Sequence, residues 1–395
     1  MNELYSGIVE QYLQLALRFD KYQQGVVDAA YGKAAQLRKR IAQEPPFALE
    51  QLYEHAQAIL SALEPISDSR AQYLYAQTLA LQTMIEKKLG RMFSFREEAQ
   101  LCLGIHHISW QDELELQQHI ETLERLLEGS GTLSERFVRW RSRFELSAQA
   151  IERFISVALN EIKARAHQLF PLPENYVEVR LVQNKPWAGY HWYQGNFRSV
   201  YELNIDIPTT IWNALHTTIH EVFCGHHTEA IVKEAELVNQ LGYDEFSISL
   251  LGTPASLLAE GLAEAAEYIM IGDTMHTVSW LNAHHDLHNS PLSERDAQIL
   301  CTLNELGHRP LINAALLMHE QHASDEAVFA YLRRFLPSED ALLHRMVARL
   351  RDADYRTYML TYPIGKLLVM RQLQAAHNPV EKFYEMLKAV NYSLN

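Results

Sequence analysis

The strongest constraint on the fold is a helical pattern of apolar residues combined with a scarcity of helix-breaking residues. Only 16 glycines and 13 prolines occur among 395 residues, and apolar side chains recur at the spacing of one helix face over most of the chain. A mainly α fold is therefore predicted, with a packed helical scaffold in the first half. The expected amphipathic helices of that half cover residues 4–28, 48–64, 69–90, 112–128 and 132–168.

One segment departs from this pattern. After the proline-rich stretch 170–173, β-branched and aromatic residues become frequent, and residues 184–208 contain glycine turn signals at Gly189 and Gly195. These features predict one small antiparallel sheet, the only sheet in the chain. The change near residue 170 suggests a helical lobe, 1–170, and a lobe with the sheet, 171–395, within one continuous domain.

The composition excludes several classes of partner. Lys and Arg number 35 against 49 Asp and Glu, a formal charge of −14, whereas nucleic acids and anionic membranes attract basic faces. No run of about 18 apolar residues predicts a membrane span, and the N-terminus lacks the basic start and apolar run of a signal peptide. The 3 cysteines are far apart and suggest no disulfide framework. We therefore expect a cytoplasmic protein with neither a nucleic-acid nor a membrane partner.

Side chains that bind metals are concentrated in residues 209–230. This segment reads TTIWNALHTTIHEVFCGHHTEA and has one apolar helical face. Its polar positions gather four histidines and a glutamate on and just beyond that helix. They are His216, His220, Glu221, His226 and His227.

The pair His220-Glu221 resembles the start of the zinc-peptidase motif His-Glu-x-x-His, in which two histidines one turn apart bind one zinc. Here Cys224 occupies the second histidine position, and His226 lies about 120° around a straight helix from His220. Two nitrogens on one zinc are only about 3–3.5 Å apart, so a straight helix cannot use both histidines. A kink at Gly225 would bring His226 back toward His220.

Three other residues are alternatives for the second ligand. His216 precedes His220 by one turn, and Cys224 follows it by one turn. His227 is nearly in phase with His220 but lies about 10.5 Å further along the axis, which makes it the poorer ligand. The residues alone leave the choice open.

The stretch HEVFCGHHTEA resembles the His-Glu-x-x-x-Gly-His-His signature of a bacterial domain-of-unknown-function family, number 885. Members of that family commonly carry Pro at the position of Cys224, and the family is similar to gluzincin zinc peptidases. The resemblance implies a multi-helix, gluzincin-like metallopeptidase fold with a small sheet beside the active-site helix. It also implies one Zn²⁺ per chain, held by His220 and His226, with Glu221 as general base.

Two later motifs extend the resemblance. The stretch Glu260-Gly261-x-Ala263 resembles the one that bears the third ligand in gluzincins, so Glu260 is the candidate, and Glu264 one turn later is a candidate partner for a ligating histidine. Residues 357–373 resemble a late Tyr-x-x-Gly helix followed by Arg. By that resemblance Tyr362 would stabilise the oxyanion, and Arg371 would hold a substrate carboxylate.

In gluzincins an edge strand before the motif helix holds extended peptides. Residues 184–208 occupy that place, so Tyr201 and Asn204 are candidate substrate contacts. Together these observations predict a zinc-dependent hydrolase of amide bonds in short peptides, with Arg371 suggesting a carboxypeptidase. The alternatives are a helical protein that binds metal or peptide without catalysis, and a metal-free scaffold.

Overall fold

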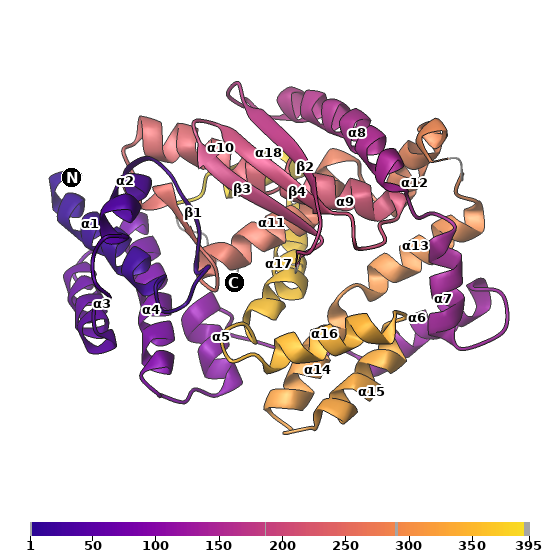
Figure 1. Cartoon of the computed structure of the whole chain (residues 1–395), viewed down its shortest axis with the longest axis horizontal. Helices are drawn as coiled ribbons and strands as arrows, with labels where there is room; N and C mark the ends of the chain where they lie inside the picture. Colours follow the sequence, from indigo (N-terminus) through magenta and orange to yellow (C-terminus); the bar gives the residue numbers. More distant parts are fainter. Residues whose placement is uncertain (1, 186, 289–290, 391–395) are drawn as a thin grey trace.

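Helices dominate the computed structural model, which describes residues 2–185, 187–288 and 291–390 (Figure 1). The helices of the first half are α1 Asn2–Phe19, α2 Gly32–Ile41, α3 Leu49–Leu63, α4 Ser69–Lys88, α5 Phe95–Leu103, α6 Glu113–Leu126, α7 Leu133–Ser142 and α8 Ala148–Leu169. Those of the second half are α9 Ile211–Glu221, α10 His226–Val232, α11 Pro254–Met270, α12 Thr274–Ala283, α13 Glu294–Leu306, α14 Arg309–His319, α15 Asp325–Phe335, α16 Asp340–Arg351, α17 Thr361–Ala375 and α18 Pro379–Leu387. The strands are β1 Val27–Ala30, β2 Tyr176–Val182, β3 Gly189–Gly195, β4 Arg198–Asn204 and β5 Ile248–Leu250.

The mainly α class predicted from the sequence is confirmed, with two changes to the expected helices. The helix expected over 4–28 ends at Phe19, and β1 follows it. The helix expected over 132–168 is divided into α7 and α8, because Ser147 starts a new helix by accepting a hydrogen bond from the Ala150 backbone N–H. Among the described residues, no helix is long and apolar enough to cross a membrane.

The three-stranded sheet is mixed rather than antiparallel. Its strand order is β2-β4-β3. Strands β3 and β4 form the expected antiparallel hairpin, with Tyr190 opposite Glu202. Strand β2 pairs on the other side of β4 and runs parallel to it, with Val179 opposite Tyr201. The chain reverses direction between β2 and β3 and again between β3 and β4, so β2 and β4 run the same way.

The prediction of a single sheet was wrong, because β1 and β5 form a second one. The two strands are antiparallel, with Val27 opposite Leu250. They contain 4 and 3 residues, too few for an alternating pattern to be recognised in the sequence. In Figure 1, β1 lies beside β3, on the side of β3 away from β4.

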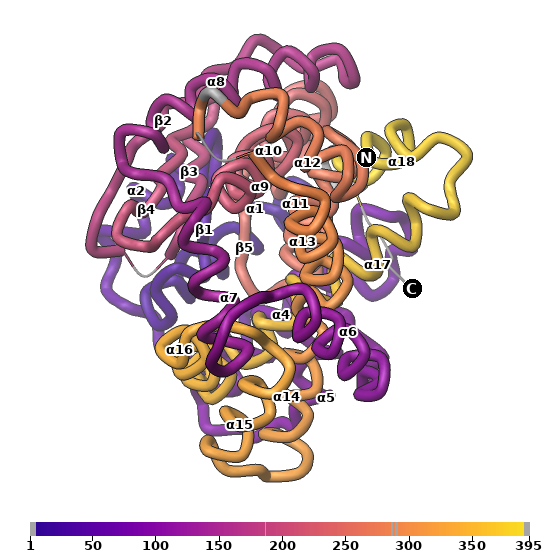
Figure 2. Tube along the Cα trace, turned by 90° about the vertical axis from the view of Figure 1, so that its right-hand side faces the viewer, coloured from indigo at the N-terminus to yellow at the C-terminus, as the bar shows by residue number. Residues whose placement is uncertain are grey.

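Two hydrophobic cores hold the helices together. The first contains Tyr12 of α1, Leu74 of α4 and Leu316 of α14. The second contains Phe154 of α8 and Leu262 of α11, together with residues from α6, α9 and α13. Figure 2 shows how segments from distant parts of the chain come together, with α14–α16 beside α5–α7. Because both cores draw on residues from each side of position 170, that position does not separate one core from the other.

Helices α11 and α17 cross at the centre of the molecule through a pair of glycines (Figure 1). A Cβ on Gly261 would lie 2.6 Å from the Gly365 carbonyl oxygen, and one on Gly365 would lie 2.7 Å from the Leu257 oxygen. Both distances are shorter than real Cβ contacts, so only glycine permits this approach. Glu260 directly precedes Gly261 on α11, and Tyr362 precedes Gly365 by three residues on α17. The crossing therefore places Glu260 and Tyr362 on turns that pack against each other.

Helix α7 is tied to α13 through the carboxylate of Asp296. Trp140 Nε1 donates a hydrogen bond of 2.7 Å to Asp296 Oδ1, and Ser293 Oγ donates one of 2.6 Å to Oδ2. Burial raises the pKa of Asp296, but the hydrogen bonds from Ser293 and Trp140 outweigh it and hold this pKa below its ordinary value. The ionised carboxylate is therefore the form that the fold stabilises.

Candidate metal centre

The histidines of the 209–230 segment lie on two helices separated by a sharp break. Helix α9 ends at Glu221, and α10 begins at His226. Between them Gly225 has φ −79° and ψ −136°, and a Cβ there would lie only 1.7 Å from the His220 carbonyl oxygen. The chain therefore folds back onto the last turn of α9 at the position where the sequence required a kink. The His226 ring returns to within 4.8 Å of the His220 ring, centroid to centroid.

This break brings two imidazoles to one carboxylate. His220 Nε2 lies 3.4 Å and His226 Nε2 lies 3.8 Å from Glu260 Oε2. A tetrahedral zinc with bonds of about 2.0–2.2 Å holds its ligand atoms roughly 3.3–3.6 Å apart. Glu260 Oε2 is buried and has no hydrogen-bond partner among the described residues, which is uncommon for a carboxylate oxygen. The spacing, the unpartnered oxygen and the two-His, one-Glu donor set all fit a zinc ion.

The other oxygen of Glu260 is held by a tyrosine that the sequence analysis did not select. Tyr358, in the turn that leads into α17, donates a hydrogen bond of 2.7 Å to Glu260 Oε1. Burial raises the pKa of Tyr358 well above its ordinary value, so the hydroxyl keeps the proton that it donates. Tyr358 precedes Tyr362 by one helical turn. This spacing could have indicated, from the sequence alone, that Tyr358 lies on the same side of the chain as Tyr362.

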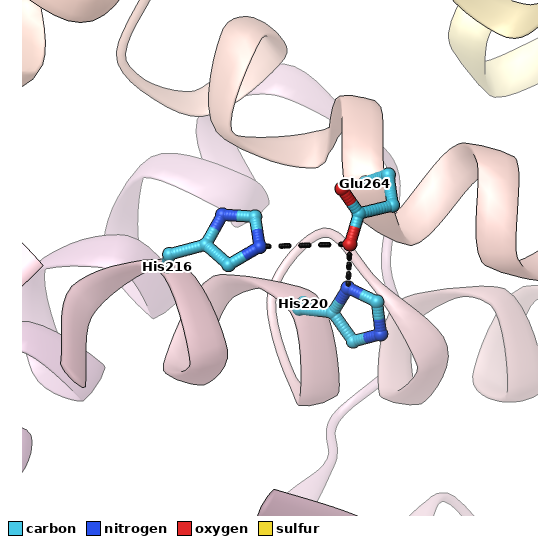
Figure 3. Close-up of side chains that lie close together, drawn as sticks. All are labelled: His216, His220 and Glu264. Atoms are coloured by element: carbon cyan, nitrogen blue, oxygen red, sulfur yellow. Dashed lines mark ion pairs between the residues drawn. The ribbon is translucent and has the colours of Figure 1, made fainter. Parts of the chain in front are cut away.

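Glu264 lies on the opposite side of His220, within ion-pair distance of its ring (Figure 3). Its Oε1 lies 3.5 Å from His220 Nδ1 and 3.7 Å from His216 Nε2, and both rings face this one oxygen. A carboxylate beside Nδ1 favours the tautomer with the proton on that nitrogen and leaves the lone pair on Nε2, which faces Glu260. Glu264 thus lies where its position one turn after Glu260 suggested.

His216 forms a second three-residue group with His220 and Glu264. Its Nδ1 also lies 2.9 Å from Glu267 Oε2, so the ring is held between two carboxylates. Burial lowers the pKa of His216, but hydrogen bonds to Glu264 and Glu267 raise it to about 10. Burial lowers the pKa of His220 as well, but Glu260, Glu221 and Glu264 outweigh burial and raise it. The two groups differ instead in that His216 is already engaged by Glu267, which favours the group of His220, His226 and Glu260.

The two remaining alternatives point away from this group. His227 is fully buried, with Nδ1 2.7 Å from Ser199 Oγ and Nε2 3.3 Å from Asn175 Oδ1, so both ring nitrogens are engaged beneath the sheet. Cys224 is also fully buried, and burial raises the pKa of its thiol. A thiol that resists deprotonation is a poor metal ligand.

Glu221 occupies the place between α9 and the start of β3. Burial raises the pKa of Glu221, whereas the charges of His220 and His226 lower it, and the net shift is upward. A Cβ on Gly189 would lie 3.5 Å from Glu221 Oε1, so the backbone of β3 passes directly over this carboxylate. The start of β3 therefore lies against Thr217 and Glu221 of α9.

An aspartate from the N-terminal part of the chain completes the surroundings. Tyr190 of β3 donates a hydrogen bond to Asp28 Oδ1 of β1. Burial raises the pKa of Asp28, the Tyr190 hydrogen bond lowers it, and the charges of His226 and Glu260 also act on it. Asp28 is thus close enough to the metal-binding group for the charges of that group to change its pKa. Sequence reasoning missed it because Asp28 and Tyr190 are far apart in the chain.

Of the predicted catalytic and carboxylate-binding residues on α17, the structure brings only Tyr362 to the cluster. The Tyr362 ring lies 5.9 Å from that of Tyr358, centroid to centroid. Burial raises the pKa of Tyr362 well above its ordinary value, and the charge of Glu260 acts in the same direction. Arg371 is exposed on the same helix. It lies about 13.5 Å further along the axis and on the opposite side, so the structure separates it from the cluster.

The two predicted substrate contacts on β4 have partners within the protein. Tyr201 is fully buried, and its hydroxyl lies 3.4 Å from Thr218 Oγ1 on α9. The Asn204 side-chain amide donates hydrogen bonds to the carbonyl oxygens of Lys185 at 2.9 Å and Trp187 at 3.1 Å. These contacts anchor the sheet to α9 and hold the loop before β3 in place.

No protein-family model matches the sequence, and no curated protein matches it. Membership of family 885 therefore stays a prediction. Among solved structures, a protein from Colwellia psychrerythraea described as a "putative lipoprotein" has a TM-score of 0.51 at 16% identity, over 94% of this chain and 66% of that one. A protein described in similar terms from Shewanella oneidensis has a TM-score of 0.47 at 11% identity, over 93% and 69%. An M32 carboxypeptidase from Deinococcus radiodurans R1 has a TM-score of 0.40 at 12% identity, over 99% and 90%.

The similarity to the Colwellia protein shows a shared fold. This chain spans 66% of that protein's length. Since the two proteins are only 16% identical, the similarity gives no function, and the candidate metal centre is the feature that bears on function.

Proposed function

We propose that the protein is a zinc-dependent peptidase that hydrolyses amide bonds in short peptides. The observation that carries this proposal is the buried Oε2 of Glu260, which has no hydrogen-bond partner in the described part of the chain and lies 3.4 Å from His220 Nε2 and 3.8 Å from His226 Nε2. These three residues would hold the ion, with Tyr358 and Glu264 fixing two of them in position. When bound, zinc supplies Lewis-acid polarisation of the scissile carbonyl.

The surrounding side chains match the roles that amide hydrolysis requires. Glu221 accepts a proton from the attacking water and then delivers it to the leaving amine, a task suited to a carboxyl group whose pKa is raised. The hydroxyl of Tyr362 donates a hydrogen bond to the developing oxyanion. Both roles need groups that are shielded from bulk water. Burial raises the pKa of both Glu221 and Tyr362, as expected of shielded groups.

The substrate would lie beside the start of β3. On the side away from β4 this strand is flanked by β1, to which Tyr190 is hydrogen-bonded through Asp28, so a peptide would meet β3 at its first residues. Its first residue, Gly189, lies over Glu221. Because Arg371 lies away from the cluster, the proposal includes no preference for a free carboxyl terminus.

The first experiment measures zinc content by mass spectrometry in the purified wild type, His220→Ala and the matched control His276→Ala. His276 is an exposed histidine on α12 whose ring contacts Asp273. We expect about one zinc per chain in the wild type and the control, and loss of zinc in His220→Ala. Absence of zinc from the wild type after incubation with the metal would contradict the proposal.

The second experiment compares hydrolysis of a short-peptide library by the wild type and by Glu221→Gln. The variant should keep its zinc and lose turnover, because the amide cannot accept the proton. A wild type that holds zinc but cleaves no peptide would favour the alternative, a metal-binding protein without catalysis.

A further inference from the structure

A pocket of about 460 Å³ lies between β1 and the outward face of the three-stranded sheet. It contains none of the three candidate zinc ligands. The side chains that line it and matter for the argument are Asp28 on β1, Trp192, Val200 and Glu202 on the sheet, Arg38 on α2 and Arg180 on β2. Asp28 links it to the metal centre, because Asp28 also accepts the hydrogen bond of Tyr190 and feels the charges of His226 and Glu260.

The two arginines of this pocket already have acidic partners elsewhere. Arg38 forms an ion pair of 3.1 Å with Asp20, and Arg180 forms one of 2.7 Å with Glu178. Neither of these two carboxylates lines the pocket. The charges of the two arginines also act on Asp28 and Glu202, but the hydrogen bonds of both guanidinium groups go to the carboxylates outside the pocket.

The two carboxylates of the pocket are not matched in this way. Asp28 is hydrogen-bonded by the uncharged hydroxyl of Tyr190. Glu202 Oε2 is buried without a hydrogen-bond partner among the described residues, and it lies 4.0 Å from Lys185 Nζ, too far for a hydrogen bond. Neither pocket carboxylate thus receives a hydrogen bond from a charged donor among the described residues, and an ammonium group would supply one.

Aromatic rings beside these carboxylates reinforce that preference. The Tyr190 and Trp192 centroids are 4.4 Å apart, and Trp187 lies 4.9 Å from Tyr190. This cluster already accommodates one cation, because Lys185 Nζ lies 5.2 Å from the Trp187 ring centroid. The face of an aromatic ring attracts an ammonium group, most strongly for Trp.

The pocket is also at a suitable distance from the catalytic group. Gly189 lies over Glu221, and Trp192 follows it by three residues on β3, which corresponds to about 10 Å of extended chain. An extended peptide with its reacting bond beside Glu221 would therefore span the distance to Trp192 within about three residues.

We propose that this pocket binds an ammonium group of the substrate through Asp28, Glu202 and the face of Trp192. The ammonium group is either a free peptide amino terminus or a lysine side chain. This inference rests on the proposed peptidase function for the identity of its ligand, and it makes the protein selective for peptides with positive charge on one side of the reacting bond.

The test measures peptide affinity by calorimetry in the Glu221→Gln protein, which is expected not to turn its ligands over. The probes are trialanine amides with one of five amino ends: free, acetylated, acetyl-lysyl, acetyl-norleucyl or acetyl-glutamyl. We expect the free or the lysyl peptide to bind at least about five-fold more tightly than its neutral counterpart, as a partly desolvated charge pair beside an aromatic face would give. Whichever of the two gains this advantage identifies the source of the ammonium group.

Variants then locate the effect. Asp28→Asn and Trp192→Leu, each added to Glu221→Gln, should remove most of the ammonium advantage, and Glu202→Gln serves as a further variant if either of them folds poorly. The matched control is Glu54→Gln, which neutralises an exposed carboxylate on α3 outside the pocket and should keep the advantage.

Three results would overturn the inference: equal affinity for charged and neutral peptides, tightest binding of the glutamyl peptide, or no measurable binding of any probe. Failure of the peptidase proposal is recorded separately, because it appears as absence of hydrolysis by the wild type. An ammonium advantage without hydrolysis would support the pocket and refute the peptidase.

Discussion

Replacing Gly225 by alanine tests the idea that the break between α9 and α10 creates the metal centre. The added Cβ would lie 1.7 Å from the His220 carbonyl oxygen and 2.8 Å from that of Ile219, whereas ordinary contacts are 3.4–4 Å. Relief of the first overlap requires the two segments to separate by about 1.7 Å. Both obstacles are backbone atoms, so no side-chain rotation can absorb the change.

A metal ion tolerates only small changes in the distances to its ligands. Metal–ligand distances vary by only about 0.2 Å in a working site, so a shift of this size removes His226 from the group it forms with His220 and Glu260. We expect zinc affinity to fall at least about 100-fold, equivalent to roughly 2.7 kcal/mol. Overpacking should also lower the free energy of unfolding by about 3 kcal/mol.

Zinc affinity is measured by competition with a chromophoric chelator, and stability by urea unfolding of the metal-free protein. The matched control is Gly7→Ala in α1, where a Cβ would meet nothing within 4 Å. That control should keep its zinc affinity and gain about 0.5–1 kcal/mol of stability, as alanine does in a helix interior. A Gly225→Ala protein that binds zinc within about three-fold of the wild type, roughly 0.6 kcal/mol, would refute the reasoning.

Three further substitutions test neighbouring parts of the argument. Glu264→Gln should weaken zinc binding about 10–100-fold in the chelator assay, because the amide no longer fixes the His220 tautomer; unchanged affinity would show that Glu264 does not orient the ring. Arg371→Ala should leave peptide turnover and zinc content unchanged, since Arg371 is exposed and lies away from the cluster; a raised KM for peptides would return it to the site. Asp296→Asn should destabilise the protein by about 1–2 kcal/mol at pH 7. Because the folded pKa of Asp296 is lowered, its contribution is present above its ordinary pKa and lost as the pH falls through the folded pKa, so the urea midpoints of variant and wild type should converge over that range.

The helical class could be predicted from the sequence, and so could the three residues that the structure brings together as the candidate metal centre. Periodicity and scarce glycine predicted the helices, and the motif His-Glu followed by Gly-His predicted that a kink would bring His226 to His220. The Glu-Gly and Tyr-x-x-Gly motifs were found as resemblances. The structure gives their physical reason, because Gly261 and Gly365 are the contact that lets α11 and α17 cross.

The parts that could not be predicted depend on contacts between distant segments. The pairing of β1 with β5 and the approach of Asp28 to Tyr190 join residues with more than a hundred others between them, and no local pattern encodes them. The parallel placement of β2 beside β4 likewise reflects how the chain enters the sheet. Arg371 shows the opposite error, since a motif match at the right distance along the chain did not place that side chain on the correct face of its helix.

The pairing of β1 with β5 has a consequence for the order in which the molecule can be built during translation. Val27 pairs with Leu250, and ribosomes add roughly 5–20 residues per second. The N-terminal strand therefore waits on the order of 10–45 s for its partner to be synthesised. During that time its main-chain N–H and C=O groups form an exposed edge, which is a template for pairing with other chains. Chaperones that bind extended segments should consequently protect the nascent chain most effectively between the emergence of β1 and that of β5.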